Sequence, residues 1–144
     1  MNLITRKASV HWKGGANGGR RAVTTGNGAP VPAKISSGIR SQSNSETDSA
    51  ELIAAAHADS FSLALSNELQ LSAVAAGEIV TTATVAVENL AAGWTIMNIH
   101  LNVVAHLPKV TQGRFIDATV RAKTNCLVSK SLRANISMTA KLEA

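Results

Sequence analysis

One segment, residues 48–68, constrains the fold of this chain more than any other, because alanine, leucine and serine dominate it. Apolar and small residues recur there at three- and four-residue steps, which is the spacing of an amphipathic α-helix. We therefore predict a helix over this segment. Its small side chains imply that another element packs closely against it. The stripe expected to be buried consists of Leu52, Ile53, Ala56, Ser60, Leu63, Ala64 and Asn67.

Polar residues mark the start of this helix, directly after a polar loop at 41–47. Asp48 and Ser49 are both able to cap the helix by accepting backbone N–H bonds that its first turn leaves open. Glu51 lies in that first turn, where a carboxylate complements the helix dipole.

β-branched residues dominate two long runs, 78–89 and 94–107, with a break between them. Together they predict a long antiparallel hairpin over residues 78–107. Three shorter strands are expected within residues 1–40, at 5–13, 20–25 and 33–39. In the first of these, one side of the strand is formed by Ala8, Val10 and Trp12.

A second helix is predicted at residues 113–132, followed by a closing strand at 134–142. The stripe that this helix is expected to bury consists of Phe115, Thr119, Ala122, Cys126 and Ser129. The element order is then βββ-α-ββ-α-β. Two helices with small-residue faces and several antiparallel strands indicate an α+β fold, and the length suits one domain over residues 1–144.

Basic residues are distributed unevenly along the chain. Residues 1–40 hold seven Lys and Arg and no Asp or Glu, whereas residues 41–144 hold seven against nine. The basic part is a candidate surface for an anionic partner. No helix-turn-helix or zinc-finger spacing accompanies it, so we do not expect nucleic acid to be that partner.

No apolar run approaches the ~20 residues that span a bilayer, and the first residues lack the hydrophobic region of a signal peptide. We therefore expect a soluble cytoplasmic protein with no membrane partner. Cys126 is the only cysteine, so an internal disulfide is impossible.

Two other chemistries are disfavoured by spacing. The glycines from Gly14 to Gly19 resemble a phosphate-binding loop, but such a loop needs a helix directly after it. The residues that follow, Arg20 to Thr25, have the pattern of a strand, so a hairpin is expected. The four histidines show no metal-ligand spacing, and His100 and His106 would lie ~20 Å apart on one strand. We expect no metal and no cofactor.

His57 and Ser60 lie one helical turn apart, as a base and a nucleophile would. No strand-turn-helix nucleophile elbow surrounds the serine, and a serine along a helix is usually a packing residue. A serine hydrolase is therefore disfavoured.

Four segments together resemble the OsmC/Ohr family of thiol peroxidases, in matching order and spacing. They are His11-Trp-Lys-Gly14, the isolated Arg40, the helix from Glu51 to Leu65, and Ala122-Lys-Thr-Asn-Cys-Leu-Val-Ser129. The resemblance covers essentially the whole chain. It implies an intertwined homodimer in which antiparallel sheets enclose the two central helices, with two active sites at the subunit interface.

In this family a cysteine on the first helix attacks an organic hydroperoxide and becomes a sulfenic acid. A cysteine on the second helix resolves it as a disulfide, which dithiols such as lipoyl groups reduce. An arginine before the first helix and a glutamate at its start lower the thiol pKa and orient the peroxide.

The match to these functional residues is incomplete. Arg40 occupies the position of the arginine, and Cys126 that of the resolving cysteine. Ser60, however, stands where the peroxidatic cysteine is expected, and Ala50 where the glutamate is expected. A proline often follows the resolving cysteine, and here that residue is Leu127.

Glu51 is a weak substitute for the missing glutamate. At about 100° per residue it lies roughly 180° around the helix from residue 60, whereas position 50 lies roughly 80° away. His57 and Phe61 are the remaining residues expected to line the binding pocket. A change of cysteine to serine alone would explain Ser60 but not Ala50, so we favour a diverged member of the family.

Two functional hypotheses follow. The first is a protein of the organic hydroperoxide stress lineage that has lost peroxidase activity, because a serine forms neither a sulfenic acid nor a disulfide. The second is a non-enzymatic dimer that binds a small apolar or anionic ligand in the same pocket. A third, weaker possibility is that Cys126 acts alone as a redox sensor, which requires it to be accessible or to have a cationic neighbour.

Overall fold

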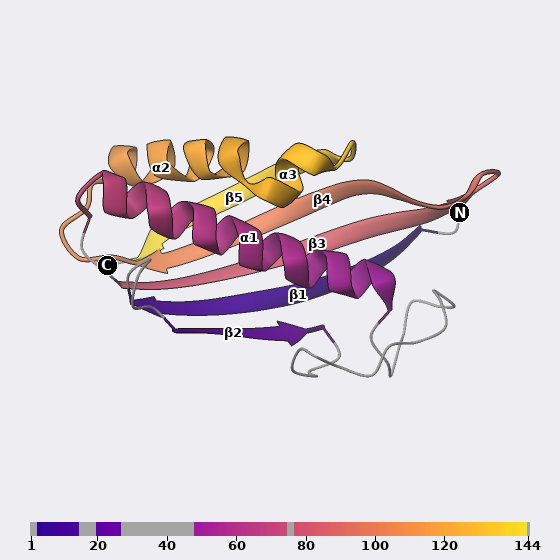
Figure 1. Cartoon of the computed structure of the whole chain (residues 1–144), viewed down its shortest axis with the longest axis horizontal. Helices are drawn as coiled ribbons and strands as arrows, with labels where there is room; N and C mark the ends of the chain where they lie inside the picture. Colours follow the sequence, from indigo (N-terminus) through magenta and orange to yellow (C-terminus); the bar gives the residue numbers. More distant parts are fainter. Residues whose placement is uncertain (1–2, 15–19, 27–47, 75–76, 144) are drawn as a thin grey trace.

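The computed structural model describes residues 3–14, 20–26, 48–74 and 77–143. In this part of the chain, helices lie on one face of a five-stranded sheet, which confirms the α+β class (Figure 1). The helices are α1 (Ser49–Leu71), α2 (Gln112–Asn125) and α3 (Leu127–Ser131). The strands are β1 (Leu3–Gly14), β2 (Arg20–Thr25), β3 (Gly77–Leu90), β4 (Gly93–His106) and β5 (Asn135–Glu143). Their order in the sheet is β2-β1-β3-β4-β5.

Alternation of side chains along each strand decides which face the helices cover. On β1, Ala8, Val10 and Trp12 are buried under α1, while His11 and Lys13, on either side of Trp12, are exposed. The same alternation runs along β3 and β4, whose buried residues include Val85, Ile99 and Leu101. The hydrophobic core therefore lies between the sheet and the helices.

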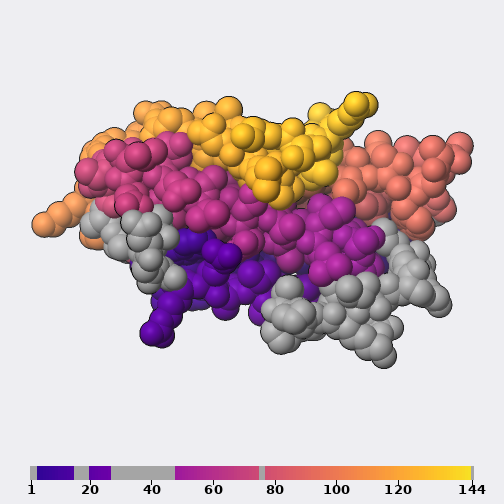
Figure 2. All heavy atoms as spheres, viewed as in Figure 1, coloured from indigo at the N-terminus to yellow at the C-terminus, as the bar shows by residue number. Residues whose placement is uncertain are grey.

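The long hairpin forms from β3 and β4, which pair antiparallel with one register shift between Ala86 and Val87. Its tip extends past α3 and past the start of α1 (Figures 1 and 2). Large apolar side chains at the tip are partly exposed: Leu90, Trp94 and Met97.

The antiparallel pairing expected for the sheet is found among β1 to β4, but β5 pairs parallel to β4. The chain leaves β4 at one end of the sheet, and α2 and α3 carry it back to the other end (Figure 1). A strand that follows such a crossover enters the sheet in the same direction as the strand before it. The sheet is therefore mixed.

The sequence predicted one continuous helix over 113–132. In the structure this helix is interrupted at Cys126. This residue has an extended backbone with φ −62° and ψ 125°, so it ends α2 and begins α3. Thr124 and Asn125 precede the break, and both have low helix propensity. The Asn125 side chain instead donates to Glu68 Oε1 on α1 over 3.1 Å. At this break the Cys126 side chain is buried in the hydrophobic core.

The stripe predicted to be buried on α1 is also wrong. All seven of its members are partly or fully exposed, and Leu63 is 40% exposed. The face against the sheet instead includes Ala54, Ala58, Phe61 and Leu65. Alanine, leucine and serine occur on nearly every side of this helix, so spacing alone did not select the buried face.

The strand predicted at 33–39 lies outside the described residues. Within the described part of the chain, no helix is both long enough and apolar enough to cross a membrane.

Candidate functional site

Ser60 and Cys126 meet at the contact between α1 and the α2–α3 junction. The Cys126 thiol donates a hydrogen bond to Ser60 Oγ over 3.4 Å, across 66 residues of sequence. Cys126 is fully buried, whereas Ser60 is half-buried. The structure thus brings together two residues that the sequence had placed on separate helices.

His57 lies one turn before Ser60 on α1 and faces the same junction. Its imidazole is fully buried, and its Nε2 is 2.8 Å from the hydroxyl of Ser129 on α3. Its Nδ1 has no hydrogen-bond partner among the residues that the structure describes. Two residues of α1 and two of the α3 segment, each pair three positions apart, therefore form a cluster of His57, Ser60, Cys126 and Ser129.

The surroundings of Cys126 favour the thiolate. Burial raises the pKa of the thiol, but hydrogen bonds from His57, Ser60 and Ser129 and from the Ser129 backbone outweigh it and lower the pKa to about 6. At neutral pH the two hydroxyls would then donate to the sulfur. No group of three or more His, Cys, Asp or Glu in the described ranges is arranged to hold a metal ion. The contacts around Cys126 thus favour a stabilised thiolate at the centre of the cluster.

A buried ion pair fixes the start of α1. Asp48 caps the helix through Oδ1, which accepts from the Glu51 N–H over 2.9 Å, and its Oδ2 accepts from Arg6 Nε over 2.6 Å. Both side chains are almost completely buried. Sequence analysis missed Arg6, although it shares the buried side of β1 with Ile4, Ala8 and Val10. The alternation of buried and exposed residues along this strand would have predicted that Arg6 is buried.

The other predicted site residues lie as follows. Ala50 and Glu51 are both buried in the first turn of α1, so Glu51 does not project into solvent. Phe61 is fully buried in the core under α1. Arg40 lies outside the described residues.

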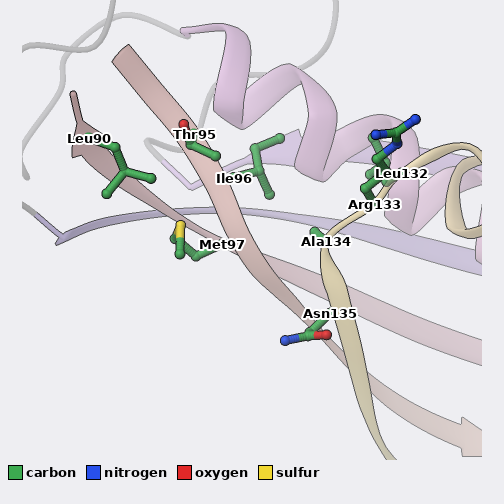
Figure 3. Close-up of a pocket in the computed structure, with 8 residues that line it drawn as sticks. All are labelled: Leu90, Thr95, Ile96, Met97, Leu132, Arg133, Ala134 and Asn135. Carbon is green, nitrogen blue, oxygen red and sulfur yellow. The ribbon is translucent and has the colours of Figure 1, made fainter. Parts of the chain in front are cut away.

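A separate cavity of about 390 Å³ lies near the hairpin tip (Figure 3). One side is formed by Leu90 and residues 95–97 of the hairpin, and the other by residues 132–135, which lead into β5. None of the four cluster residues lines it. Among the expected pocket residues, His57, Phe61 and Cys126 are instead fully buried within a single chain.

Comparison with known proteins identifies the family. The OsmC-like protein family matches residues 42–141. Peroxiredoxin OsmC of Escherichia coli is 32% identical over 141 residues, which cover 98% of this chain and 99% of that protein. The chain belongs to the OsmC-like family.

Solved structures support the fold of this OsmC-like chain. An OsmC-like protein of unknown function from Vibrio cholerae has a TM-score of 0.64 at 15% identity, over 94% of this chain and 97% of that one. The organic hydroperoxide resistance protein OhrB of Bacillus subtilis has a TM-score of 0.55 at 17% identity, with the same coverage. At these identities the likeness concerns the fold alone.

Proposed function

We propose that this OsmC-like protein descends from thiol peroxidases that act on organic hydroperoxides, and that its two-cysteine cycle is absent because serine occupies position 60. The contact between Ser60 Oγ and Cys126 Sγ carries the proposal. A peroxidatic thiol and its resolving thiol must approach closely enough to form an S–S bond of about 2 Å. A pair of side-chain atoms 3.4 Å apart needs only a small movement for that.

Ser60 lacks the chemistry of the first step. In a peroxidase the attacking thiolate forms an S–O bond, the O–O bond breaks, and the alkoxide leaves as an alcohol after taking a proton. The resolving thiolate then forms a disulfide and releases water, and a dithiol restores both thiols. A hydroxyl near neutral pH is almost wholly protonated and forms no sulfenic acid, so neither step starts at Ser60.

The test is to restore the thiol with Ser60→Cys. With cumene hydroperoxide and dihydrolipoamide, the wild-type protein should consume peroxide at the background rate of a free thiol. The variant should exceed this rate by at least tenfold and should form an intramolecular disulfide with Cys126. Ser131→Cys, which places a thiol on an exposed part of α3, supplies the background.

Turnover by the wild-type protein well above that background would overturn the proposal. If Ser60→Cys remains inert, the loss extends beyond the thiol, and Ala50 is the next position to restore. The double variant Ala50→Glu with Ser60→Cys should then recover activity. Failure of the double variant to form either sulfenic acid or disulfide would contradict the assignment of this site.

A homodimer is part of the proposal. α1 packs on the sheet and also on α2 and α3, yet apolar side chains remain exposed on these helices. Leu63 of α1 is 40% exposed, and Val120 of α2 and Leu127 of α3 are 53% and 70% exposed. A second copy of the chain is the occupant that the family resemblance indicates for this surface.

The alternative function is binding without turnover, in a pocket completed by that second copy. The buried Nδ1 of His57, without a partner among the described residues, favours it, because a ligand would satisfy this atom. Cumyl alcohol, a non-reactive analogue of the hydroperoxide, should bind the wild-type protein saturably, and His57→Phe should weaken binding at least fivefold. No binding to the wild-type protein would remove this alternative and leave the first proposal untouched.

A further inference from the structure

A cluster of cations lies on the helix-free face of the sheet, where β1 ends and β2 begins. His11 and Lys13 alternate with the buried Trp12, so both project from the face that carries no helix. Arg20 is the direct cross-strand partner of Lys13, and Ala22 that of His11. A groove of about 240 Å³ runs between them, lined by His11, Lys13, Arg20, Arg21 and Ala22.

The pairing of Lys13 with Arg20 is unfavourable by itself, because like charges directly opposite each other in a sheet repel. One carboxylate, Glu78 on β3, lies on the other side of Lys13. It is hydrogen-bonded to His11, and it is 3.9 Å from Lys13 Nζ. Arg20 is exposed and makes no ion pair with any residue that the structure describes.

Arg21 is held in place from the opposite face. Its guanidinium lies over the Trp12 ring at 5.4 Å and pairs with Asp59 of α1 over 2.7 Å. The antiparallel pairing of β1 with β2 and these two contacts hold the groove residues in place without a ligand. Glu78 and Asp59 together leave the groove with an excess of positive charge.

From this arrangement we infer that the groove binds a small multivalent oxyanion, such as the phosphate or pyrophosphate group of a soluble metabolite. The anion would lie between Lys13 and Arg20 and remove their mutual repulsion, with His11 as a further donor. Arginine suits this task because its planar guanidinium donates two parallel hydrogen bonds to a phosphate. The site is small and open, which suits a soluble ligand better than a polymer.

Calorimetric titration of the full chain with inorganic pyrophosphate tests this inference. The wild-type protein should bind saturably at one site per chain, and Arg20→Gln and Lys13→Gln should each weaken binding at least tenfold. Arg133→Gln is the matched control. Arg133 is also exposed and lies outside the groove, and the substitution removes the same charge. It should change the affinity less than twofold.

Absence of saturable binding to the wild-type protein would overturn the inference. So would an equal loss in Arg133→Gln, because the charge would then act as a general surface field. A DNA duplex or a phosphatidylserine vesicle that binds more tightly than pyrophosphate, and that depends on Arg133 as much as on Arg20, would likewise contradict a localised site. The proposed peroxidase lineage is independent of all these outcomes.

Discussion

The surroundings of Cys126 have opposite effects on the pKa of its thiol. The side chain is fully buried, which disfavours a charge, yet donors from His57, Ser60 and Ser129 overcome this and bring the pKa to about 6. A thiolate with no route to solvent in a single chain is stabilised but inaccessible. This burial disfavours the third possibility, that Cys126 acts alone as a redox sensor.

The ionisation of Cys126 can be measured directly. Thiolate absorbance at 240 nm, with Cys126→Ser as the blank, should rise with a midpoint near pH 6. Ser129→Ala removes one donor and should move the midpoint upward. A midpoint above pH 8 in the wild-type protein would contradict the hydrogen-bonded arrangement.

The same thiol should make stability depend on pH. Its folded-state pKa is lowered to about 6, against ~8.5 for an unfolded cysteine. Between these values the unfolded chain binds more protons, so stability rises with pH in this window and is lost as pH falls through 6. The free energy of unfolding of the wild type, minus that of Cys126→Ser, should therefore increase from pH 6 to pH 8.5 by at most about 1.4 kcal/mol per pH unit. A difference that stays constant in urea titrations across this range would refute the shift.

Among the elements, α1 is followed by an alanine in an unfavourable left-handed backbone conformation. Ala73 has a φ of 58° directly after the helix, and its N–H donates to Gln70 C=O while the Val74 N–H donates to Leu69 C=O. These two bonds form a Schellman motif, which favours glycine at the left-handed position. Alanine there pays a steric cost that glycine avoids.

Ala73→Gly should therefore stabilise the protein by about 1 kcal/mol, since relief of left-handed strain outweighs the added freedom of the unfolded chain. The matched control is Ala56→Gly, the same exchange at an exposed position inside α1. It should destabilise the protein by about 1 kcal/mol. Chemical denaturation measures both, and a loss of stability in Ala73→Gly would show that the motif is not maintained in solution.

In the molecule as a whole, the helices bury one side against the sheet and leave apolar residues on the other. Leu127, at 70% exposed, and Val120, at 53%, lie on this outer side. We expect this outer side to form the proposed homodimer interface. Leu127 directly follows Cys126, so a partner chain there would also control access to the Ser60–Cys126 cluster.

Scattering at micromolar concentration should give twice the chain mass of 14.9 kDa. Leu127→Glu and Val120→Glu each place a charge in the proposed interface and should shift the protein toward monomer. Asn102→Glu, on the exposed helix-free face of β4, should leave the dimer intact. A wild-type mass near one chain would contradict the proposed homodimer.

The sequence by itself determined most of the helices and strands, because periodicity and capping act locally. It predicted the helix capped by Asp48 and the long hairpin of β3 and β4, and the resemblance paired Ser60 with Cys126. Only the tertiary structure decided the face that α1 buries, the break at Cys126 and the parallel direction of β5. These depend on contacts between segments far apart in the chain, such as Asn125 with Glu68, which no local pattern encodes. The resemblance placed Ser60 where the family is expected to have a cysteine, but the hydrogen bonds around Cys126 required the fold.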